Sequence, residues 1–91
     1  MVFDLQLENL IKSLVKIDSG DEVELFFKEL LTESEIETLS KRWRILEMLK
    51  NGYTQREVAK ELQVSLCKVT RGAKILKDEK SVLARIIKEN K

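Results

Sequence analysis

The sequence predicts an all-α fold of about six helices, and three observations carry that prediction. The chain contains no proline, and its three glycines (Gly20, Gly52 and Gly72) stand far apart. Apolar residues recur at helical spacing along most of the chain, and capping residues precede several of these stretches. With 91 residues, of which 43% are apolar and 36% charged, the chain has the size and composition of one globular domain, which we assign to residues 1–91.

The first two predicted helices carry wide apolar stripes. In the first, over residues 3–17, the stripe is formed by Phe3, Leu7, Leu10, Ile11, Leu14, Val15 and Ile17. Gly20 ends this helix, and an Asp or Ser within "IDSGDE" caps the next one. One face of the second helix is apolar and consists of Val23, Phe26, Phe27, Leu30 and Leu31.

The third predicted helix begins at a capping box formed by Thr32 and Glu35. It runs to about Asn51, where Gly52 stops it. Its main apolar row is Ile36, Leu39, Trp43, Leu46 and Leu49. We interpret Trp43 as a core or dimer residue rather than as a mimic of a ligand.

Two short helices and a helical tail follow. A second capping box, Thr54 with Glu57, opens the fourth helix, and Ser65 caps a fifth that runs from Leu66 to about Lys77. The tail starts at Asp78 or Ser81, and its helical row of apolar residues is Val82, Leu83, Ile86 and Ile87.

The size of the chain predicts an intertwined homodimer. A monomer this small buries only about 60–65% of the surface of its unfolded chain, and six short helices give one another few neighbours. We expect residues 1–51 and 79–91 to form the dimerisation core. Residues 54–77, which we call the reading head, project from it.

Charge is segregated along the chain although the net charge is only +1. Residues 1–40 hold three basic and ten acidic residues, whereas residues 41–91 hold fourteen basic and six acidic ones. This asymmetry favours an acidic scaffold and a basic contact half, although two solvated faces would give the same counts.

The reading head has the pattern of a helix-turn-helix that binds double-stranded DNA. Ala59 is the small residue that lets the two helices cross, and the predicted core consists of Val58, Leu62, Val64, Leu66 and Val69. Gln63 occupies the turn position usually held by Gly, so it adopts a left-handed conformation or the turn differs. The alternative is a helical hairpin packed in a bundle.

Eight residues of the reading head are candidates for DNA contacts: Gln55, Arg56, Lys60, Ser65, Cys67, Lys68, Thr70 and Lys74. Gln55 is placed to bond a phosphate at a helix N-terminus. Lys68 is expected to donate to guanine, and Thr70 to contact a base edge or a phosphate. Cys67 is interpreted as a small neutral contact surface rather than a redox sensor, since no histidine is present to activate it.

Several function classes lack support. The chain has no histidine base, glycine-rich phosphate loop or nucleophile motif, so we predict that it is not an enzyme. One cysteine and no histidine leave no metal-ligand cluster. No apolar run is long enough for a membrane span and no signal peptide is evident, so we expect a cytoplasmic protein without a membrane partner.

The stretches "LLTESEIETLSKRWRILEMLKNGYTQREVAKEL" and "KVTRGAKILK", within residues 30–77, resemble the bacterial Trp repressor family. The most specific elements are "LT", Arg42 with Arg44, "TQRE" and "TRG". The resemblance implies an intertwined helical dimer that binds operator DNA. It also implies a small amino-acid ligand, L-tryptophan, which acts as corepressor and positions the reading heads; no other cofactor is implied.

The resemblance also implies a ligand site. Arg42 and Arg71 would stack on the two faces of the indole, and Arg71 would also bind the carboxylate. Thr32 and the backbone carbonyl of Leu31 would lie near the ammonium, while Gly72 would leave room for the ring. Alternatively, the two arginines are surface residues or phosphate contacts, and Gly72 permits close helix packing.

Two departures from the family pattern concern ligand binding and the orientation of the reading head. The family usually has a serine that helps to hold the ammonium where this chain has Ile75, and the linker "NGYTQRE" is one residue shorter. A related branch with the shorter linker lacks the "RG" pair and has no established dependence on tryptophan. A repressor-like protein that does not bind tryptophan, or a helical dimerising adaptor, therefore remains as an alternative.

Overall fold

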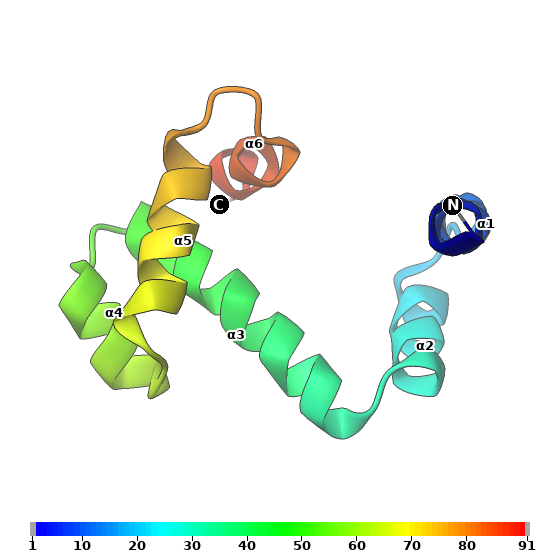
Figure 1. The fold of residues 1–91 in the computed structure, drawn as a ribbon, viewed down its shortest axis with the longest axis horizontal. Helices are drawn as coiled ribbons and strands as arrows, with labels where there is room; N and C mark the ends of the chain where they lie inside the picture. The colour runs from blue at the N-terminus through cyan, green and yellow to red at the C-terminus, as the bar shows by residue number, and fades with distance from the viewer. Residues whose placement is uncertain (1, 91) are drawn as a thin grey trace. The chain divides into compact units, whose positions relative to one another are not determined.

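The computed structural model describes residues 2–90, with side chains from residue 5 onward, and Figure 1 shows its helices in chain order. They are α1 (Val2–Val15), α2 (Gly20–Leu30), α3 (Glu33–Lys50), α4 (Gln55–Leu62), α5 (Leu66–Lys77) and α6 (Val82–Glu89). The predicted all-α fold of six helices is confirmed for these residues. Met1, Lys91 and the side chain of Phe3 lie outside the described residues.

The helices form two compact units, Met1–Ile36 and Glu37–Lys91. The first unit holds nine acidic and three basic residues, and the second holds fourteen basic and seven acidic ones. The charge boundary seen in the sequence therefore coincides with a structural boundary. The assignment of residues 1–51 and 79–91 to a dimerisation core remains a prediction.

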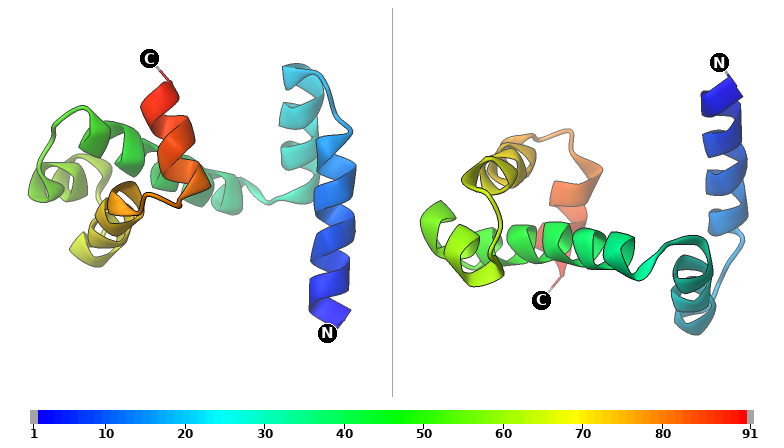
Figure 2. Two further views of the ribbon diagram at one scale, coloured as in Figure 1. Left: turned by 90° about the horizontal axis from the view of Figure 1, so that it is seen from above. Right: turned by 60° about the horizontal axis from the view of Figure 1, so that its bottom comes forward.

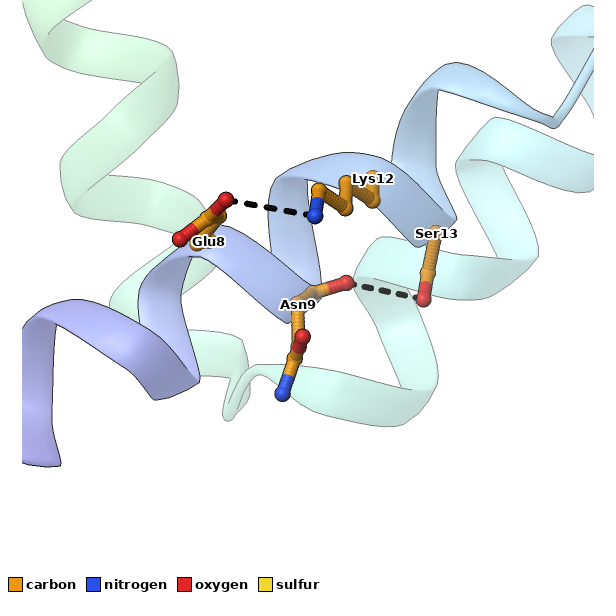
Figure 3. Close-up of polar contacts among 4 residues, drawn as sticks. All are labelled: Glu8, Asn9, Lys12 and Ser13. Carbon is orange, nitrogen blue, oxygen red and sulfur yellow. Dashed lines mark hydrogen bonds and ion pairs between the residues drawn. The ribbon is translucent and has the colours of Figure 1, made fainter.

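Local contacts stabilise the helices of the first unit. In α1, Lys12 Nζ lies 3.2 Å from Glu8 Oε1, and Ser13 Oγ donates to the Asn9 carbonyl at 2.9 Å (Figure 3). At the start of α2, Ser19 Oγ accepts from the Glu22 amide at 3.1 Å, so the serine is the cap. An exposed pair such as Lys12–Glu8 contributes only about 0.2–0.5 kcal/mol.

The apolar faces of α1 and α2 are not covered within the first unit. Val15, Leu5, Leu25 and Ile11 are 77%, 60%, 58% and 51% exposed, respectively. No residue of α2 is buried. Among residues 5–36, whose side chains are described, none is fully buried, and Leu10, Leu14, Val23 and Phe26 are half-buried.

The second unit has a core between α3, α4 and α5, and Figure 2 shows these helices from two further directions. It is formed by Ile45, Met48, Val58 and Val69, and four partly buried residues pack against it: Leu49, Ala59, Leu62 and Val64. On α6, Ala84 and Ile87 are buried as well. A hydrogen bond from Lys50 Nζ to the Asn90 carbonyl joins the C-terminal ends of α3 and α6.

One core prediction is wrong. Leu66 is 47% exposed because it begins α5, ahead of Val69, the first residue that this helix buries. Of the predicted apolar row of α3, Leu46 is buried and Leu49 packs against the core, while Leu39 is 44% exposed in the single chain. Ile45 and Met48, which lie outside that row, are buried as well.

The turn between α4 and α5 uses the left-handed conformation that the sequence offered as one possibility. Gln63 has φ 54° and ψ 48°, and its amide donates to the carbonyls of Ala59 and Lys60. The Val64 amide donates to the Ala59 carbonyl at 3.1 Å, which closes a Schellman-type cap. A non-glycine residue therefore makes the tight turn of the reading head.

Gly72 is buried where α5 crosses α3. A Cβ at this position would lie 2.9 Å from Ile45 Cγ2, 3.5 Å from Leu46 Cδ2 and 3.7 Å from Leu49 Cδ1. The β-branched Ile45 is only 3% exposed, so its methyl group cannot move away cheaply. The absence of a side chain thus allows the close approach of the two helices.

Gly72→Ala is expected to lower the free energy of unfolding by about 1–2 kcal/mol, because overpacking outweighs the better helix propensity of alanine. Urea unfolding at one fixed protein concentration measures the change. Gly20→Ala is the matched control, since nothing lies within 4 Å of its Cβ position. It should be neutral or slightly stabilising, and equal effects of the two variants would contradict the packing role of Gly72.

Candidate nucleic-acid interface

The first helix of the reading head starts at the predicted capping box. The Thr54 amide donates to Glu57 Oε1 at 2.8 Å, and the Glu57 amide donates to Thr54 Oγ1 at 3.1 Å. The backbone amide of Thr54, followed by its hydroxyl, lowers the pKa of Glu57 below its ordinary value of 4.5. The carboxylate of Glu57 is therefore held at the N-terminus of α4.

The exposed face of α5 follows from the side that it buries. Val69 and Gly72 are buried, while Cys67, Arg71 and Lys74 are exposed. Residues spaced by three and four positions share one helix face, so these three side chains line the solvent side of α5. Ser65 Oγ accepts from the Lys68 amide at 3.3 Å, which confirms Ser65 as the N-cap and places Lys68 in the first turn.

The basic residues of the reading head are free for an anionic partner. The reading head holds six exposed basic residues, and none of them makes an ion pair with a side chain of residues 5–90: Arg56, Lys60, Lys68, Arg71, Lys74 and Lys77. Its two acidic residues are Glu57, which is held in the capping box at the start of α4, and the exposed Glu61. Six basic and two acidic residues give the reading head a net charge of +4, which favours phosphate binding.

A side-chain hydrogen bond links the two helices of the reading head. Thr70 Oγ1 donates to Gln55 Oε1 at 2.9 Å, and both residues are half-buried. The sequence predicted each residue separately as a DNA contact. Their mutual bond escaped prediction because they are 15 positions apart and neither shows a local signal for it.

Four of the predicted ligand residues lie in the second unit. Arg42 on α3 and Arg71 on α5 are exposed, Ile75 is half-buried, and Gly72 is buried against Ile45. The close helix packing that was the alternative role of Gly72 is thus present. The role of these residues in ligand binding remains a prediction.

The other two predicted ligand residues belong to the first unit. Leu31 is the C-cap of α2, where its amide donates to the Phe27 carbonyl at 2.9 Å. Thr32 Oγ1 accepts from the Glu35 amide at 3.1 Å, and the Thr32 amide donates to Glu35 Oε1 at 2.8 Å. The predicted capping box of α3 is confirmed, and it engages the Thr32 hydroxyl as an acceptor.

Two further features are absent from the part of the chain that the structure describes. No group of three His, Cys, Asp or Glu side chains there is arranged to hold a metal ion. Within residues 2–90, no helix has the length and apolar character needed to cross a bilayer.

Comparison with known proteins gives matches to one family. Residues 5–91 match the family model described as Trp repressor protein. Proteins from Xylella fastidiosa strains M23 and 9a5c, each described as a Trp operon repressor homolog, are 50% identical to the chain over 72 residues. The alignment covers 78% of this chain and 78% of each relative. No solved structure matches the chain significantly.

The lowered pKa of Glu57 predicts a pH dependence of stability. Because the folded-state pKa lies below the unfolded one, the stabilisation is fully present above the ordinary value of 4.5 and is lost as pH falls through the folded pKa. Urea unfolding across this acid range should show the loss. Glu57→Gln keeps a hydrogen-bond acceptor for the cap but has no group that titrates in this range, so its free energy of unfolding should depend less on pH. Identical pH dependence in the wild-type chain and the variant would contradict the assignment of the effect to Glu57.

Proposed function

The chain belongs to the Trp repressor family, a family of transcriptional repressors, and we propose that it binds double-stranded operator DNA through its reading head. The observation that supports this most directly is the exposed face of α5. That face carries Cys67, Arg71 and Lys74 while the opposite side of the helix is buried. In a helix-turn-helix the second helix enters the major groove, which needs such an exposed polar face.

The first helix supports the same assignment. Arg56 and Lys60 are exposed on α4, and Gln55 is its first residue. These groups suit contacts with the phosphate backbone on either side of the groove.

We also propose that the functional form is a homodimer. The first unit exposes apolar residues on α1 and α2, and the second unit separately exposes Val82, at 61%, on α6; a second copy of the chain would cover such residues. A two-fold symmetric dimer presents two recognition helices to two half-sites. The N-terminal helices would then obtain their core from the partner subunit.

L-tryptophan is the ligand that we propose for this repressor. Arg42 and Arg71 are exposed and make no ion pair within residues 5–90, so their guanidinium groups are available to stack on an indole. Arg71 also lies on α5, so a carboxylate bound there would act directly on the recognition helix. The Xylella relatives are described as Trp operon repressor homologs, which supports regulation of tryptophan genes.

A repressor that does not bind tryptophan is the second candidate, and a specific observation favours it. The half-buried Ile75 has no hydroxyl to donate or accept, and Ile45 already occupies the space at Gly72. In that case the reading head would bind its operator without a ligand.

Affinity for duplex DNA is expected to fall steeply with salt, because each neutralised phosphate contributes about −0.9 to the slope of log affinity against log salt. Lys60→Ala and Lys68→Ala should each reduce this slope by about 0.9 per lost contact. Fluorescence anisotropy over a salt series measures it. Lys28→Ala, which removes an exposed lysine paired with Glu24 in the first unit, is the control. Binding without salt dependence, or no binding, would favour a helical adaptor.

Calorimetry is expected to detect L-tryptophan binding to the wild-type chain and to find none with Arg71→Ala. Ile75→Ser should tighten binding by about 10- to 150-fold, since a hydrogen bond to a charged group contributes about 1.5–3 kcal/mol. Arg85→Ala, at an exposed arginine of α6, is the control. If the wild-type chain gives no heat at millimolar L-tryptophan, the corepressor proposal is wrong and the repressor that acts without a ligand remains.

A further inference from the structure

The hydrogen bond between Thr70 and Gln55 determines which groups at the polar surface of the reading head remain as donors and which as acceptors. A threonine hydroxyl has a single proton and two lone pairs. In the structure Thr70 Oγ1 donates that proton to Gln55 Oε1 at 2.9 Å. As long as this bond persists, Thr70 can only accept a further hydrogen bond.

We infer that Gln55 is a positioning residue that makes Thr70 an acceptor-only contact. The pair then selects a base that presents an amino group in the major groove. This inference rests on the proposed binding of operator DNA. In the major groove, adenine N6 and cytosine N4 are the donors, whereas guanine O6, guanine N7 and thymine O4 are acceptors. Thr70 would therefore prefer adenine or cytosine at the position it faces.

The location of Thr70 on α5 suits such a contact. It lies three positions after Cys67 and four before Lys74, both on the exposed face, and it is itself half-buried. Its side chain therefore borders the face offered to DNA while remaining packed against α4. Because a cysteine thiol is only a weak hydrogen-bonding group, Cys67 does not compete for the same base.

Gln55 keeps a separate function in this arrangement. Its carbonyl oxygen accepts from Thr70, which leaves both N–H donors of the amide for other partners. Gln55 is also the first residue of α4. A phosphate that accepts from these side-chain donors would fix the amide plane and, through it, the direction of the Thr70 hydroxyl.

Substitutions of Gln55 separate this function from a simple brace between the helices. Gln55→Glu retains an acceptor for the Thr70 hydroxyl but places a negative charge near the DNA backbone. It should weaken binding to all duplexes and keep the base preference. Gln55→Met has a similar length and no acceptor, so it frees the hydroxyl to donate and should relax the preference.

The experiment selects bound duplexes from a random-sequence library with the full-length wild-type chain and its variants. Wild type should prefer adenine or cytosine over guanine or thymine by about tenfold at one position of each half-site. Thr70→Val and Gln55→Met should lose this preference, while Thr70→Ser and Gln55→Glu should keep it. Urea unfolding of each variant shows whether the fold is intact.

Two results would overturn the inference. Retention of the preference by Thr70→Val or Gln55→Met would show that another residue reads that base. If the variants lose affinity in proportion to their loss of stability and keep the same base preference, the bond serves only to hold α4 and α5 together. Failure of wild type to retain any duplex would instead refute the proposed function, and this inference with it; the two failures are therefore distinguishable.

Discussion

The contact of Gly72 with Ile45 sets the position of α5, and the geometry of the reading head depends on it. Because Gly72 has no Cβ, the backbone of α5 approaches the side chains of α3 closely. This approach directs Val69 into the core with Met48 and Val58, and a residue buried on one side fixes which residues face outward. The cationic face of α5 is thus a consequence of packing on its other side.

Electrostatics then determine how that face can act. The two units carry opposite net charges, and the basic unit contains the reading head. An acidic residue on α4 would weaken attraction to phosphate, but the capping box holds Glu57 at the helix N-terminus. The basic side chains keep their charge available because none of those on the reading head pairs with a carboxylate within residues 5–90. Stabilisation of the helix and exposure of positive charge are therefore compatible.

Local features could be predicted from the sequence, whereas features that depend on distant neighbours could not. The capping boxes at Thr32 and Thr54 join residues three positions apart, so the sequence contains all the information they need. The burial of Ile45 and Met48, which lie outside the predicted apolar row of α3, depends on where α4 and α5 pack along α3, which helical periodicity does not specify. The same reason explains the exposed Leu66. For the candidate site, the sequence supplied the exposed residues of the reading head but not the bond between Thr70 and Gln55.

The packing of Gly72 also constrains how a ligand can regulate this protein. A ligand shifts a conformational equilibrium only by its difference in affinity for the two states. Ile45 already determines the closest distance between α3 and α5, so a ligand is not needed to create that distance. The proposed tryptophan site consists instead of Arg42 and Arg71, whose side chains are exposed, whereas the contact of Gly72 with Ile45 is buried. Under this proposal a bound ligand would act on α5 through Arg71 and would leave the core of the second unit intact.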